Sequence, residues 1–379
     1  MDQIDTEQAL DYEYFSDLQA FSIPMEWDLA WQSPGGSTMS YRGNGASLDC
    51  CSLLWSQELK SRWRLAETMN FTFRLNQAED KERRRFHYQV GFEKRLPRGF
   101  SVSLFGEPAY DKEDSDIGLG AGWKPSEGIE VSLRLIVADF PLNRKAGGPQ
   151  RYSRQPITQE LRADAAVGAG RLRLHLELDH PTRREVWADA RSYSYRKTTA
   201  RTEYLWPVRH LTAKLSYGFE YHHEGDYYSP DPASKSVDYR RMTQTVLAAA
   251  LADLGADDSL EAGHSLILRH ARNDHPHDPG AGIMYRRWEA QPFARWRHRA
   301  SRLVATELAA FLSLGEYRKR HPAHLIPSVF DPLIQAKLGA GLDLTFGPKG
   351  RLGFYGAFDL DDMASHPWDG GGIRAMFVF

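Results

Sequence analysis

The chain has 379 residues, of which 41% are hydrophobic and 26% are charged, and its formal net charge at pH 7 is -2. Its mean hydropathy is -0.54, and no stretch approaches the ~20 consecutive apolar residues of a transmembrane helix. These values exclude a helical membrane protein, and the small net charge supplies no global field that would attract nucleic acid. The aromatic content of 12% argues against a disordered chain.

Residues 1–61 show only short pieces of regular pattern. The first five residues are acidic and contain no apolar stretch typical of a signal peptide. Apolar and polar residues alternate around 25–31, and the chain could return through 48–55, so we expect an arm, a plug or an additional hairpin. The only cysteines, Cys50 and Cys51, are adjacent and cannot form a disulfide framework. We expect two free thiols there, with a vicinal disulfide as the alternative.

From residue 62 onward the dominant period of the sequence is two. Residues 171–178 read Arg-Leu-Arg-Leu-His-Leu-Glu-Leu, and residues 129–137 and 334–346 alternate in the same way. Strict alternation indicates strands with one apolar and one polar face. Because such runs recur to the end of the chain, we predict that residues 62–379 form a single all-β domain.

Short and long connectors alternate between these runs. Short turns are expected at 168–170 and 347–350, whereas 222–236 and 315–330 read as long polar connectors. This alternation is typical of a transmembrane up-and-down β-barrel, which has short turns at one rim and long loops at the other. We therefore predict an antiparallel transmembrane barrel of about sixteen strands, or about eighteen if residues 1–61 add a hairpin.

The last strand ends the chain on an aromatic residue. Ile373, Ala375, Phe377 and Phe379 alternate on one face. This resembles the C-terminal strand of Gram-negative outer-membrane β-barrel proteins, in which the terminal aromatic residue is part of an assembly signal. The resemblance implies that Phe377 and Phe379 carry that signal. It further implies outer-membrane localisation after removal of a signal peptide, and contact with outer-membrane lipid, lipopolysaccharide and the barrel assembly machinery. Residues 1–61 would then lie where a periplasmic partner could bind.

In such a barrel the apolar face of each strand meets lipid and the charged face lines the lumen. Aromatic residues near strand ends, such as Trp63 and Trp123, would form the interfacial girdle. Most of the inward charges are expected to pair across strands. The predicted lumen-lining residues are Arg64, Arg74, Glu93, Arg95, Arg134, Arg162, Arg171, Arg173, Glu177, Arg191, Lys214, Glu220, Arg269, Arg287, Glu289, Arg295, Lys337 and Asp343.

Two further features of the sequence concern the interior. The basic loop 142–154 carries Arg144, Lys145, Arg151 and Arg154 and could fold inward as a constriction. Gly118, Gly120 and Gly122 occupy alternate positions of one strand, so they would form a smooth lumen-facing stripe that another group can approach closely.

The chemistry-bearing motifs are sparse. Asp274, His275, His277 and Asp278 crowd one loop, but a solvated polar loop explains them better than a metal site. We expect no cofactor, no metal, no nucleic-acid partner and no enzymatic activity. The sequence favours a pore that transports or exports hydrophilic solutes or polymers through an Arg-rich lumen. A scaffold barrel enclosing a partner, such as part of an export complex or an electron-transfer conduit, and an outer-membrane enzyme with a site at the rim are the alternatives.

Overall fold

The computed structural model describes most of the chain. The described residues are 25–32, 38–48, 52–79, 84–107, 115–144, 148–230, 236–277, 282–320, 328–329, 333–346, 350–361, 363–364 and 368–378. Cys50 and Cys51 lie outside them. Among the described residues, no helix is both long enough and apolar enough to cross a membrane.

Strands make up nearly all of the regular structure. The first half of the chain contains β1 Met25–Gln32, β2 Thr38–Leu48, β3 Ser52–Ala66, β4 Met69–Glu79, β5 Arg84–Arg95, β6 Phe100–Glu107, β7 Asp116–Ser126, β8 Ile129–Val137, β9 Gln150–Arg154, β10 Ile157–Val167 and β11 Gly170–Val186. The second half contains β12 Arg191–Val208, β13 Leu211–Tyr228, β14 Val237–Asp253, β15 Asp258–Asp274, β16 Ile283–His298, β17 Val304–Arg320, β18 Ser328–Val329, β19 Leu333–Thr345, β20 Gly350–Asp359 and β21 Trp368–Val378. Within the described residues, two single-turn 3-10 helices, η2 Pro97–Gly99 and η4 Leu142–Arg144, lie between strands.

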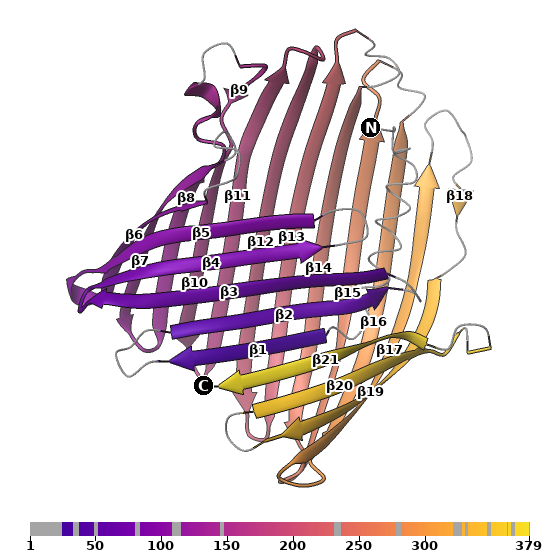
Figure 1. The fold of residues 1–379 in the computed structure, drawn as a ribbon. Coiled ribbons are helices and arrows are strands. Elements are labelled where there is room, and N and C mark those ends of the chain that lie inside the picture. The colour runs from indigo at the N-terminus through magenta and orange to yellow at the C-terminus, as the bar shows by residue number, and fades with distance from the viewer. Residues whose placement is uncertain are drawn as a thin grey trace.

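These strands form one sheet that closes on itself. Apart from the short strands β9 and β18, successive strands pair in antiparallel fashion, and β1 pairs with β21 in parallel, with Leu29 opposite Phe377. Figure 1 shows the long strands β11–β17 forming one side of the barrel, with β1–β5 and β19–β21 crossing the other side. Because the sheet is closed, each strand of the wall has a neighbour on both sides, and the backbone N–H and C=O groups bond to these neighbours. The predicted antiparallel up-and-down barrel is confirmed.

The wall contains more strands than the sixteen expected first, because residues 25–61 contribute to it. β1, β2 and the first part of β3 belong to the sheet, so the expected boundary after residue 61 falls within β3. The alternative of about eighteen strands is therefore closer to the structure than the first expectation of about sixteen. β9 and β18 are short, and nineteen of the twenty-one strands in the described part of the chain remain without them. An odd number of up-and-down strands requires a parallel closing pair, as β1 and β21 form. Residues 1–24 lie outside the described part.

Several strands run past their predicted ends on the side of the long connectors. The expected loop beginning at residue 222 is strand up to Tyr228, and the one beginning at residue 315 is strand up to Arg320. Sequence alternation marks only the part of a strand that has an apolar face, whereas backbone pairing continues beyond it. The short turn at 168–170 lies where predicted, between β10 and β11, whereas residues 347–349 of the other expected turn lie outside the described residues. At the turn between β10 and β11, Gly168 has a φ of 60°, which type II′ hairpins require at their first central position.

The outer face of the wall is apolar and exposed. Leu119, Leu133 and Leu215 are each more than half exposed, although they lie in the middle of paired strands. Trp288 and Trp296 lie on the outer face of β16, eight residues or roughly 27 Å apart along the strand. That separation is close to the ~25 Å apolar band of barrels that cross a membrane, which interfacial aromatic residues border. Trp63 and Trp123, both 40% exposed, lie near the short turns as predicted.

The glycine stripe of β7 accommodates a bulky inner side chain. A Cβ atom added to Gly118 would lie 2.1 Å from the ring of Phe105 on β6, which is 6% exposed. The guanidinium of Arg134 on β8 lies 4.2 Å from the centre of that ring. Arg134 also donates a hydrogen bond to Gln89 on β5 at 2.8 Å, so it reaches across β6 and β7. The group that approaches the stripe closely is therefore Phe105, with Arg134 above it.

Replacing Gly118 with alanine is expected to lower the free energy of unfolding by roughly 1–3 kcal/mol, because the added methyl group overpacks against Phe105. Unfolding by urea in lipid vesicles, followed by tryptophan fluorescence, measures the change. Gly255→Ala is the matched control, because nothing lies within 4 Å of the Cβ position at Gly255. Equal stability of the two variants would contradict this packing arrangement.

Candidate functional site: the charged inner wall

The strand register places the predicted lumen residues on the face opposite to the exposed leucines. Arg134 stands opposite Glu160, and Glu160 stands opposite Glu177, whereas Leu133 and Leu161 pair on the outer face. The same alternation assigns every charged residue of the predicted set to the inner face, from Arg64 on β3 to Asp343 on β19. That they line a conducting pore stays a prediction.

Glu160 is the centre of an ion-pair group on β8, β10 and β11. Its carboxylate is 3.2 Å from Nη1 of Arg134 and accepts a 2.6 Å hydrogen bond from Nε of Arg162. The Nε2 atom of His175 lies 3.1 Å from the same carboxylate. Glu160 is only 6% exposed. The group follows from the register, since Arg134 lies directly opposite Glu160 and Arg162 directly opposite His175.

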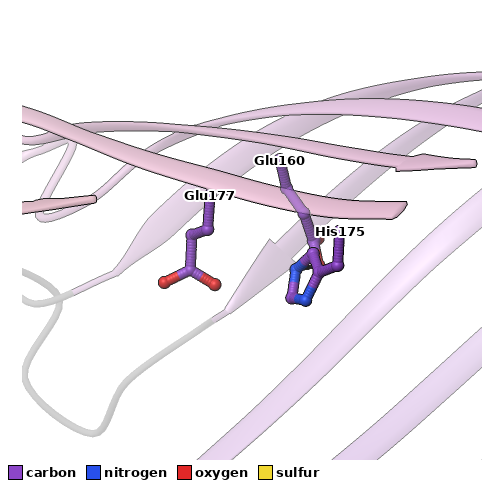
Figure 2. A group of neighbouring side chains, drawn as sticks. All are labelled: Glu160, His175 and Glu177. Carbon is purple, nitrogen blue, oxygen red and sulfur yellow. Dashed lines mark hydrogen bonds and ion pairs between the residues drawn. The ribbon is translucent and has the colours of Figure 1, made fainter. Parts of the chain in front are cut away.

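Glu160, His175 and Glu177 could in principle hold a metal ion, since their ligand atoms lie within 4.8 Å of one another (Figure 2). Two guanidinium groups already bind the Glu160 carboxylate, and the Nζ atom of Lys197 lies 3.9 Å from Glu177. A cation would have to displace these positive charges. The donor set therefore fits an ion-pair group better than a metal centre.

A second ion-pair group lies nearer the short turns. Arg171 binds Asp164 through two hydrogen bonds, of 2.5 and 2.9 Å. Glu203 on β12 accepts from Arg173 at 2.9 Å and lies 2.8 Å from Nζ of Lys214. Each carboxylate therefore binds cations from neighbouring strands, so the charges cross-link the wall, as expected for cross-strand pairs.

One inner guanidinium in this region has no acidic partner. Within the described part of the chain, no carboxylate lies within ion-pair distance of Arg201, although Arg201 stands opposite His175. Arg201 faces a hollow of about 890 Å³ that Arg162, Arg173 and Glu203 also line. The guanidinium groups of Arg162, Arg173 and Arg201 equal in number the carboxylates around this hollow, and among these cations Arg201 is the one without an acidic partner in the described part of the chain.

The inner face of β15–β17 differs because it is withdrawn from solvent. Glu289 has no exposed surface. Its carboxylate binds Arg287 and accepts hydrogen bonds of 2.5 Å from both Gln291 and Ser313. Toward the long connectors, Tyr285 and Tyr317 stack with ring centres 5.6 Å apart. Sequence reasoning found the charged members of this arc and missed Gln291 and Ser313, because uncharged polar residues do not stand out in an alternating pattern.

The remaining predicted inner residues extend the same pattern. Arg191 binds Asp226 near the long-connector rim, and Glu220 accepts from Arg241 at 2.8 Å. Arg295 lies 3.1 Å from Glu307, and Arg297 lies 3.1 Å from Asp343. Glu93 binds Arg62, and the other predicted residues on this face are Arg74, Arg95, Arg269 and Lys337.

The expected constriction loop does not enter the lumen where it is described. β9 pairs with residues 183–186 of β11, so Arg151 and Arg154 are exposed residues of the rim. The side-chain amide of Asn143 accepts a 2.7 Å hydrogen bond from the backbone N–H of Tyr152 and donates a 2.9 Å hydrogen bond to its carbonyl oxygen. Burial, together with a hydrogen bond to Asp139, raises the pKa of Tyr152 above its ordinary value. The interpretation as an inward loop is therefore wrong for Arg151 and Arg154, because strand pairing holds them at the rim.

Other predicted positions lie partly outside the described residues. Lys145, Asp278 and Phe379 are outside them, as is the side chain of Arg144. Phe377 belongs to β21, and its role in assembly stays a prediction. Asp274 is the last residue of β15, faces outward and forms an ion pair with Arg272 at 2.6 Å.

No protein-family profile matches this chain, and no curated protein matches it. OmpT, an outer membrane protein of Vibrio cholerae, is 8% identical with a TM-score of 0.40, and the match covers 86% of this chain and 98% of OmpT. The anion-selective porin of Comamonas acidovorans is 11% identical with a TM-score of 0.37, covering 89% of this chain and 98% of the porin. OccK10 of Pseudomonas aeruginosa is 10% identical with a TM-score of 0.39, covering 94% and 99%.

The strand pairing of this chain defines its fold. Its closed antiparallel wall has an apolar outer face and a charged inner face. This is the architecture of an outer-membrane β-barrel.

Replacing Glu160 with glutamine is expected to lower the free energy of unfolding by roughly 1–3 kcal/mol, because Arg134 and Arg162 lose a shared carboxylate. Glu130→Gln is the matched control on the same inner face. Glu130 lies 3.5 Å from Lys124, and both side chains are more than half exposed, so its loss should cost less than ~1 kcal/mol. Urea unfolding in lipid vesicles measures both, and a larger effect at Glu130 would contradict this assignment.

Proposed function

We propose that this protein is an outer-membrane channel through which small hydrophilic solutes diffuse, with a preference for anions. The observation that carries the proposal is the inner wall of β10–β13, where Arg201, which has no acidic partner among the described residues, faces a solvated hollow of about 890 Å³. A charged wall in contact with water lets a polar solute exchange hydration for contacts with guanidinium groups.

The placement in the membrane follows from the outer face. Exposed leucines between two tryptophan levels need an apolar surrounding, which the hydrocarbon of a bilayer supplies. In the outer membrane of a Gram-negative bacterium, the short turns would face the periplasm and the long connectors the exterior. The proposal includes the outer-membrane lipids and the assembly machinery as partners, and it includes no catalytic step.

The ion pairs of the inner wall explain why the expected selectivity is moderate. Glu160, Asp164 and Glu203 each neutralise guanidinium or ammonium groups, so few fixed charges act on a passing solute. Arg201 has no such partner among the described residues, and its charge remains fully available. The open part of the lumen lies along β10–β13, since the inner face of β15–β17 is buried.

The protein in planar bilayers under a KCl gradient is expected to conduct and to give a reversal potential that indicates preference for chloride. Arg201→Gln should reduce the ratio of chloride to potassium permeability by roughly two- to fivefold, because one unit charge at ~4–10 Å in water contributes about 0.4–1 kcal/mol. Arg154→Gln is the matched control, since it removes one guanidinium at the rim.

Two results would contradict this function. A folded barrel that never conducts would favour the scaffold alternative, in which the lumen is closed or encloses a partner. Equal selectivity of the wild type and the Arg201 variant would show that the conducting path does not pass the hollow at Arg201. Heat-modifiable migration on gels verifies that each variant is folded before conductance is measured.

A further inference from the structure

The outer face of β14–β17 carries arginine and histidine directly beyond the apolar band. These four strands lie side by side in the long wall of Figure 1. On β16 the outward positions run from Trp288 to Arg286 toward the long connectors. Leu268 is followed by His270 on β15, and Leu314 is followed by Glu316 and Arg318 on β17. The outer face therefore changes from apolar to basic within one or two outward positions.

The register brings guanidinium groups into direct opposition on this face. Arg286 stands opposite Arg318 on one side and opposite the imidazole of His270 on the other. One outward position further along, Arg240 stands opposite Arg272. Like charges directly opposite each other destabilise a sheet. An anion bound between them would remove this repulsion.

Most of these cations have an acidic partner on their own strand, and Arg286 does not. Arg240 binds Asp238, Arg272 binds Asp274, and Arg318 binds Glu316. The outward neighbours of Arg286 on β16 are Met284 and Trp288, so no carboxylate is supplied there. Within the described part of the chain, Arg286 has no ion-pair partner, and Nε2 of His270 has no hydrogen-bond partner.

A groove of about 480 Å³ lies at this point of the outer face. Arg286, His270 and Arg318 line it on the polar side, and Met242, Leu268 and Trp288 line it on the apolar side. The acid in its wall, Glu316, binds Arg318 and accepts a 3.2 Å hydrogen bond from Nε1 of Trp288. Its two oxygens are thereby engaged, and the guanidinium of Arg286 remains available.

We propose that this groove binds a phosphorylated lipid of the membrane leaflet on the long-connector side. Its phosphate would lie between Arg286 and His270, and its acyl chain would lie along Leu268 and Trp288. Arginine binds phosphate oxygens through paired hydrogen bonds, and basic groups at the membrane surface attract anionic headgroups. The proposal rests on the membrane placement given under Proposed function and does not depend on conduction.

The test is native mass spectrometry of the full-length barrel in a neutral detergent. Diphosphorylated lipid A is the probe, phosphatidylethanolamine is the comparison lipid, and inorganic phosphate is the third ligand. Wild-type protein is expected to retain lipid A in preference to phosphatidylethanolamine. Arg286→Gln should weaken lipid A binding about tenfold or more, as loss of a charged hydrogen-bond donor implies. Arg286→Lys should have a smaller effect because it keeps the charge.

Arg196→Gln is the matched control. Arg196 lies on the outer face of β12, with its guanidinium 5.8 Å from the ring centre of Tyr221, and it is not one of the residues that line the groove. Equal loss of binding in this variant, or undiminished binding in Arg286→Gln, would overturn the location of the site. If lipid A is not preferred over phosphatidylethanolamine, the groove does not select a phosphorylated lipid. If inorganic phosphate binds equally well, the acyl chains do not contribute to binding, and the ligand is not a lipid. Conductance of the same samples separates these outcomes from failure of the channel proposal.

Discussion

The structure depends on the closed hydrogen-bonded sheet, in which adjacent strands satisfy one another's backbone groups. Pairing of β1 with β21 completes the closure. Because the backbone of each strand is paired within this wall, successive side chains must point alternately inward and outward. The two faces can then differ completely in chemistry, as Leu133 and Arg134 do at adjacent positions of one strand.

The inner wall combines cross-linking with charge. Glu160 binds guanidinium groups from β8 and β10, so its burial is compensated by charged hydrogen bonds. Arg201 differs from its neighbours because it contributes charge without a carboxylate to neutralise it. On the opposite arc, Glu289 is enclosed by Arg287, Gln291 and Ser313, and there the polar groups serve the packing of the wall. The proposed solute path is therefore assigned to one side of the lumen.

On the outer face, the residue type depends on the position along the strand: apolar residues occupy the middle, and basic residues follow toward the long connectors. On β16, Trp296 and Trp288 border the apolar stretch, and Arg286 follows immediately beyond it. The length of the strands above this level explains why basic groups can lie on the outer face without entering hydrocarbon. The inner and outer arginines thus have different partners, with the solute on one side and the proposed lipid phosphate on the other.

The sequence alone determined the class of the fold and the face of each charged residue, because a period of two and alternating connector lengths are local properties of the chain. Only the tertiary structure decided which charges meet, since the partners of Glu160 come from different strands and depend on register. It also determined that β9 pairs at the rim and that residues 25–61 add strands to the wall. The isolation of Arg286 could not be read from the sequence for the same reason: the absence of a partner depends on what every neighbouring strand presents at that level.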